Sequence, residues 1–170
     1  VEIGQKEIGG GIFCDWFSAK NVGLREMRSG GERVFLEEKS YALDVEKALC
    51  ENAETNLSAQ CGRPETVIPD VYVGDGEEIT LAGMTAKVIA TPGHTVGSCC
   101  YYFAKDKVLI SGDTLFQESV GRTDFPRGSA SDLIRAIREK LMPLPDDVTV
   151  YTGHDESTLI GYERMHNPYL

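Results

Sequence analysis

Three stretches of this sequence each end a predicted β-strand in the same way: AKVIATPGH (residues 86–94), VLISGD (108–113) and VTVYTGH (148–154). An apolar strand is followed by small polar residues or Pro, then by Gly, and then by His94, Asp113 or His154. Glycine allows the backbone to turn sharply as it leaves a sheet, which directs the next side chain over the sheet's edge. If the strands are neighbours, these three side chains meet at one rim.

Two imidazoles and one carboxylate form a ligand set that suits Zn²⁺, Fe²⁺ or Mn²⁺ and leaves a position open for water. A single His or Asp after Gly is more often a turn residue. Three such endings in one chain, using two of its three histidines, nevertheless favour a metal site formed by His94, Asp113 and His154. The third histidine, His166, is expected to be a surface or packing residue.

The surrounding pattern predicts a layered α/β fold with a largely β core. The strong predicted helix, residues 131–141, places Leu133, Ile137 and Leu141 on one face and has Ser129 as its N-cap. The remaining expected elements are strands at 33–36, 67–73, 78–81, 85–90, 98–104, 108–110 and 148–151, helices at 22–28 and 41–51, and a hairpin turn at 74–76.

Length and charge restrict the class of protein. The 170 residues predict a single domain, which can bury roughly 70% of its unfolded surface. The net charge of −10 disfavours binding to nucleic acid or to anionic lipid, and no apolar run is long enough to span a membrane. The five cysteines lack CxxC spacing, so they are expected to be reduced thiols of a cytoplasmic protein, with Cys99 and Cys100 inert in a strand.

The motifs TPGHTVGS (91–98), SGDTLFQESVGRTDFPRG (111–128) and YTGH (151–154), followed by STLIGYERMHNPYL (157–170), resemble the metallo-β-lactamase superfamily, specifically its short glyoxalase II-like hydrolases. The resemblance is strong over residues 63–170 and loose over 1–62. It implies an αββα sandwich with the metal site at the edge between two sheets. In that family His94 would hold one metal, Asp113 would bridge two metals, and His154 would hold the second.

The family's HxHxDH motif is absent. Its six positions fall on residues 15–20 (DWFSAK), where only Asp15 could bind a cation and Lys20 would oppose one. The first strands of the N-terminal sheet also have no counterpart, which leaves an edge that a second copy of the chain could cover as a homodimer. We therefore expect at most one metal ion per chain, zinc, iron or manganese, held by His94, Asp113, His154 and Asp15.

The resemblance implies hydrolysis of a small thioester or ester. A bound metal lowers the pKa of its water to about 7 and supplies hydroxide as the nucleophile, or Asp113 acts as general base. Ser119 and Arg122 are candidates for orienting an anionic substrate, although Arg122 could equally form a structural ion pair with Asp124. The family's glutathione-binding extension has no counterpart, which favours a generic substrate over a glutathione thioester.

Two alternatives stay open. Trp16 and Phe17 could fill the emptied part of the metal pocket, which would produce a catalytically inactive member of the fold acting as a binding or scaffold subunit. The unusual N-terminal stretch could instead mean that the chain is a fragment, an engineered form or an unreliable sequence, in which case the ordinary enzyme would be the natural protein.

Overall fold

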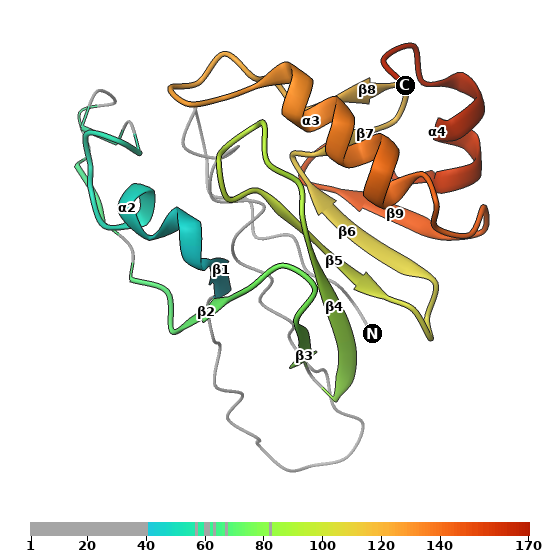
Figure 1. Cartoon of the computed structure of the whole chain (residues 1–170), viewed down its shortest axis with the longest axis horizontal. Helices are drawn as coiled ribbons and strands as arrows, with labels where there is room; N and C mark the ends of the chain where they lie inside the picture. Colours follow the sequence, from blue (N-terminus) through green and yellow to red (C-terminus); the bar gives the residue numbers. More distant parts are fainter. Residues whose placement is uncertain (1–40, 57, 60–61, 63, 67, 82) are drawn as a thin grey trace.

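The computed structural model describes residues 41–170 except positions 57, 60, 61, 63, 67 and 82. Its described residues form a central six-stranded mixed sheet (Figure 1). Strands β3 to β6 form an antiparallel meander, and β9 pairs in parallel with β6 and antiparallel with β10. In sheet order the strands are β10 (Thr158–Leu159), β9 (Thr149–Thr152), β6 (Val108–Gly112), β5 (Cys99–Phe103), β4 (Met84–Ala90) and β3 (Glu78–Leu81).

The crossover from β6 to β9 contains a short hairpin, β7 (Leu115–Phe116) and β8 (Ser119–Val120), and the helix α3 (Ala130–Ala136). A π-helical turn, η2 (Ile137–Leu141), continues α3. The backbone N–H of Asp132 donates to Ser129 Oγ at 3.3 Å, which confirms the predicted N-cap.

Alternation along the strands sorts their side chains onto two faces of the sheet. On one face Cys100 and Leu109 pack against Leu133, Ile137 and Leu141, which confirms the apolar face predicted for the helix. The helix α4 (Ile160–His166), which the periodicity did not predict, lies on the same side as α3 (Figure 1). The opposite face carries a second cluster, formed by Leu43, Val73, Ile79, Ala86, Val88, Cys99, Tyr101 and Phe103.

A smaller parallel sheet of β1 (Tyr41–Leu43) and β2 (Val71–Val73) packs on that second face. The prediction of one helix over residues 41–51 is wrong at its start, because Ala42 and Leu43 are buried by pairing with β2. The chain then continues through a 3₁₀ turn, η1 (Asp44–Glu46), and a short helix, α2 (Lys47–Cys50).

The hairpin predicted at residues 74–76 is also wrong. The chain does turn there, with Gly76 at a φ of +80°, but β2 pairs with β1 in the smaller sheet instead of with β3. The turn therefore carries the chain from one sheet to the other.

Leu49 and Cys50 of α2 pack against Ala42 and Tyr72 of the smaller sheet. The described residues are therefore layered as helices, large sheet, small sheet and helix, in agreement with the predicted αββα sandwich. The predicted helix at 22–28, the strand at 33–36, Asp15 and the expected loss of the first strands lie outside the described residues. No helix in the described part of the chain is long and apolar enough to cross a membrane.

Candidate functional site

The three predicted ligands follow three strands of the large sheet. His94 comes shortly after β4, Asp113 directly after β6, and His154 shortly after β9. All three line one cleft of about 450 Å³, together with Phe116, Gln117, Ser119, Val120, Gly121, Arg122, Asp155 and Glu156. The order of the strands therefore brings the three endings to one place, as the sequence predicted.

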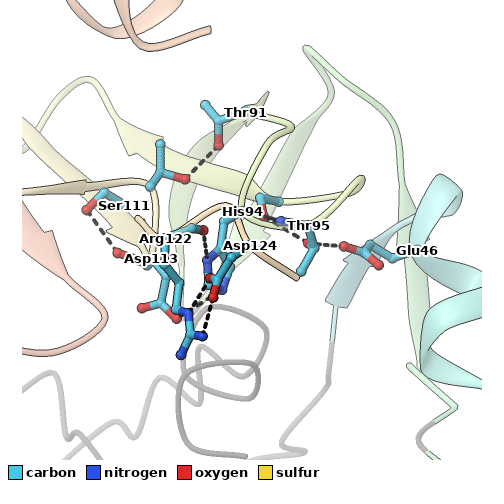
Figure 2. Close-up of polar contacts among 11 residues, drawn as sticks. Glu46, Thr91, His94, Thr95, Ser111, Asp113, Arg122 and Asp124 are labelled. Carbon is cyan, nitrogen blue, oxygen red and sulfur yellow. Dashed lines mark hydrogen bonds and ion pairs between the residues drawn. The ribbon is translucent and has the colours of Figure 1, made fainter. Parts of the chain in front are cut away.

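His94 and Asp113 form the buried half of this site. His94 Nε2 lies 3.6 Å from Asp113 Oδ2, and both side chains are almost completely buried. His94 Nδ1 lies 2.8 Å from the backbone carbonyl oxygen of Arg122 (Figure 2). Because a carbonyl oxygen only accepts, Nδ1 donates to it, and Nε2 points toward the Asp113 carboxylate. The imidazole ring also meets Phe125 edge-on, with a centroid distance of 5.1 Å.

His154 forms the exposed half of the site. Its side chain is 50% exposed, its Nδ1 lies 2.7 Å from Asp155 Oδ2, and its ring centroid lies 4.4 Å from that of Phe116. Within the described residues, no three His, Cys, Asp or Glu side chains come close enough together to hold one metal ion. His154 therefore shares the cleft with His94 and Asp113 without joining them in a closed ligand cluster, and the metal-ligand set stays a prediction.

Two glycines leave room for Asp113, Gly153 beside its carboxylate and Gly121 beside its backbone carbonyl. A Cβ at Gly153 would lie 2.1 Å from Asp113 Oδ1, and one at Gly121 would lie 1.9 Å from the Asp113 carbonyl oxygen. Any larger residue at either position would push Asp113 away. By their chemistry alone, two imidazoles and one carboxylate suit a divalent cation such as zinc, iron or manganese.

Arg122 and Ser119, the candidates for orienting a substrate, both line the cleft. The Arg122 guanidinium donates two hydrogen bonds of 2.7 Å to the Asp124 carboxylate and lies 4.5 Å from the centre of the Phe125 ring. This hydrogen bonding to Arg122 lowers the pKa of Asp124 to about 2. The structure thus contains the ion pair that was the alternative interpretation of Arg122.

A buried carboxylate that the sequence did not single out supports the loop after His94. Glu46 is completely buried and accepts hydrogen bonds from Thr95 Oγ1 and from the backbone N–H of Gly97, the latter at 2.8 Å (Figure 2). A Cβ at Gly97 would lie 1.9 Å from Glu46 Cγ, so the loop and the carboxylate fit closely. Glu46 lies in the 3₁₀ turn that follows β1, and no spacing in the sequence signals its burial.

The cysteines near the site take no part in it. Cys99 and Cys100 are both buried, and burial raises the pKa of the Cys100 thiol to about 12. A thiol with such a pKa stays protonated at neutral pH and is a poor nucleophile. The prediction that Cys100 is inert is therefore confirmed.

Among known proteins, GloC of Haemophilus influenzae, a hydroxyacylglutathione hydrolase, is 42% identical over 107 residues, which cover 62% of this chain and 50% of that protein. A probable metallo-hydrolase of Streptococcus pyogenes is 36% identical over 137 residues, which cover 76% and 58% of the two chains. The chain spans about half the length of the curated relatives it matches.

Solved structures with the same fold include the BLEG-1 B3 metallo-beta-lactamase, with a TM-score of 0.70 and 39% identity over 76% of this chain and 63% of that one. The protein TTHA1623 in a di-iron-bound form has a TM-score of 0.65 and 30% identity over 76% and 64%. Residues 28–154 match the family model of the Metallo-beta-lactamase superfamily. The chain belongs to the metallo-β-lactamase superfamily.

Proposed function

We propose that this chain carries the metal-binding cleft of a glyoxalase II-like hydrolase acting on a small thioester or ester. The observation that carries the proposal is that three strand endings bring two histidines and an aspartate to one cleft. The similarity to GloC and to a probable metallo-hydrolase supports hydrolysis as the reaction class.

The residues proposed to hold the metal are His94 through Nε2, Asp113 through its carboxylate and His154 through its ring. Zinc, iron and manganese all suit this donor set, and the di-iron form of TTHA1623 supports iron as one of the candidates. When bound, such an ion would supply Lewis acidity toward a substrate carbonyl and would acidify a water molecule.

The chain's own residues have separate tasks in this proposal. In the alternative in which Asp113 acts as general base, its Oδ2, which lies 3.6 Å from His94 Nε2, accepts the proton of the attacking water. The Arg122 carbonyl holds His94 in the tautomer that leaves Nε2 available. Ser119 and the Arg122 guanidinium, which lie at the rim, orient the substrate.

A second candidate function is a catalytically inactive binding or scaffold subunit. One observation favours it: the described residues contain no closed three-ligand cluster. The two candidates differ in whether the purified protein holds metal.

Elemental analysis of the purified chain tests the proposal. We expect stoichiometric zinc, iron or manganese in the parent and its loss in Asp113→Ala and His154→Ala. His166→Ala is the matched control, because this exposed histidine stacks on Tyr162, away from the cleft. Metal content would then justify a screen of thioester substrates. If the parent contains no metal and both variants fold as well as the parent, the hydrolase proposal is contradicted, and the inactive binding or scaffold subunit remains.

A further inference from the structure

The helix α4 holds one side of the cleft through a buried carboxylate. Glu163 is completely buried, and three donors surround its carboxylate. Its Oε2 accepts from the backbone N–H of Glu118 at 2.9 Å and from Asn167 Nδ2 at 2.8 Å, and its Oε1 accepts from Thr158 Oγ1 at 2.6 Å. A carboxylate buried this deeply is tolerated only when its acceptor sites are satisfied, as they are here.

Tyr162 on the same helix and Asn167 just after it contact two adjacent residues of the chain, Glu118 and Ser119. The Tyr162 hydroxyl donates to the Glu118 carboxylate, and Asn167 Nδ2 donates to the Ser119 carbonyl at 3.0 Å. Glu118 itself has a φ of +53°, a left-handed conformation that residues other than glycine rarely adopt. Such a conformation persists only where the surroundings impose it. The contacts from the end of the chain supply that restraint.

Residues 117–122, here called the rim segment, connect Glu118 to the buried half of the site. Gln117, Ser119, Val120, Gly121 and Arg122 all line the cleft. At the end of the segment, the Arg122 carbonyl accepts the hydrogen bond from His94 Nδ1. A shift of the rim segment therefore moves both the cleft wall and the acceptor that fixes the His94 tautomer.

We propose that Glu163 is a positioning residue of this cleft, which holds the rim segment in place and, through the Arg122 carbonyl, orients the His94 imidazole. A leucine would fill the same space without the cost of burying a charge, but it could not bind the Glu118 N–H. The consequence for turnover rests on the proposed function. The mechanical part, the restraint of the rim segment, does not.

Hydrogen exchange on the full chain without added metal tests the mechanical part, with Glu163→Leu and Glu163→Gln compared. Leucine removes every acceptor, whereas glutamine keeps an oxygen for Glu118 and Asn167 and can donate its amide to Thr158 Oγ1. We expect exchange in the rim segment to rise at least tenfold in Glu163→Leu and less than threefold in Glu163→Gln, with β4 and β5 unchanged. A rise spread evenly over the sheet, or none in the rim segment, would overturn the proposal.

Tyr162→Phe keeps the test decisive if Glu163→Leu does not fold. This change removes only the hydroxyl that contacts the Glu118 side chain, and we expect a smaller rise in exchange confined to the rim segment. Exchange there equal to that of the parent would count against the proposal.

Thioester turnover and metal content separate this proposal from the proposed function. If both are present in the parent, Glu163→Leu should lower kcat more than it raises KM, and Glu163→Gln should restore most of the loss. If the parent holds no metal, the proposed function fails, while selective exchange in the rim segment still establishes Glu163 as its restraint.

Discussion

The two halves of the candidate site differ in how they are held. His94 and Asp113 are almost completely buried, whereas the His154 side chain is half exposed and pairs with its own neighbour, Asp155. The buried half is positioned by the core of the protein, and the exposed half is positioned by a short loop. Of the three proposed ligands, His94 and Asp113 are therefore fixed by packing, and His154 is fixed less firmly.

The strands that precede the two halves differ in their outer neighbours: β4 and β9 both lie second from an edge, but β3 outside β4 has four residues and β10 outside β9 has two. Strands β4 and β6 flank β5 in the sheet interior, and Thr91 Oγ1 lies 2.8 Å from Thr114 Oγ1, which joins the chain beside His94 to the chain beside Asp113. Strand β9 has the two-residue strand β10 as its outer neighbour. Less structure surrounds His154, so its side chain reaches solvent.

Loss of Glu46 should break the support of the buried half. Glu46→Ala takes the buried carboxylate away from the Gly97 N–H and from the Thr95 hydroxyl, which keeps only Ser98 Oγ, and we expect this to lower the free energy of unfolding by about 3 kcal/mol. Urea unfolding measures the change. Val45→Ala is the control, since Val45 is 57% exposed and its truncation should cost less than about 0.5 kcal/mol. Equal costs for the two variants would mean that Glu46 does not support the loop.

Gly153→Ala should disturb the close approach of the loop before His154 to the Asp113 carboxylate, because the new Cβ would lie 2.1 Å from Asp113 Oδ1. We expect a loss of about 2 kcal/mol in unfolding free energy, as for other overpacked positions, and metal binding weakened together with it. Gly74→Ala is the matched control, as the nearest atom to its Cβ would be the end of the Glu77 side chain, 3.9 Å away. If Gly153→Ala behaved like the control, the space beside Asp113 would be larger than the structure has it.

Replacing each of the two cleft histidines in the metal-free protein should sharpen the comparison between the buried and the exposed half. His94→Ala deletes the donor to the Arg122 carbonyl in a buried place and should cost about 1.5 kcal/mol in unfolding free energy. His154→Ala should change the same quantity by less than about 0.5 kcal/mol, because its side chain is half exposed. Equal costs in thermal or urea unfolding would show that the two halves are held alike.

The smallest effect concerns the ion pair of Arg122 and Asp124 at the exposed rim. The pKa of Asp124 lies at about 2, below its ordinary value of 3.8, so the stabilisation from this pair is present above pH 3.8 and is lost as the pH falls toward 2. An NMR titration of the Asp124 carboxyl carbon should give a midpoint near 2 in the parent. In Arg122→Gln the midpoint should return toward 3.8, and an unchanged midpoint would rule out this cause.

The strand endings could be predicted from the sequence because their signals are local. Each apolar run ending in Gly and a polar residue predicts both a strand and its exit, and the Ser129 cap needs only the following turn. Glu46 and Glu163 gave no such signal. A charged residue in a helical pattern suggests an exposed side chain, and the Glu118 N–H that Glu163 accepts from is 45 residues away in the chain.

The smaller sheet was mispredicted for the same physical reason. Residues 41–43 have no strong preference of their own, and their strand exists because β2 lies beside them. The side-chain direction of His154 also depends on its surroundings, namely Asp155, which has a φ of +67°, and the Phe116 ring. Sequence spacing predicted where His154 enters the cleft but not which atom it would contact.

The parallel pairing of β6 with β9 also sets when the cleft can exist during synthesis. The backbone N–H of Gly153 donates to the Gly112 carbonyl at 2.9 Å, so the two turns that present Asp113 and His154 are joined directly. A chain emerging from the ribosome has made β3 to β6 and α3 before β9 arrives. Because α4 follows β9, the Glu163 restraint arrives later still. The three proposed ligands, His94, Asp113 and His154, can therefore meet only after β9 has been made.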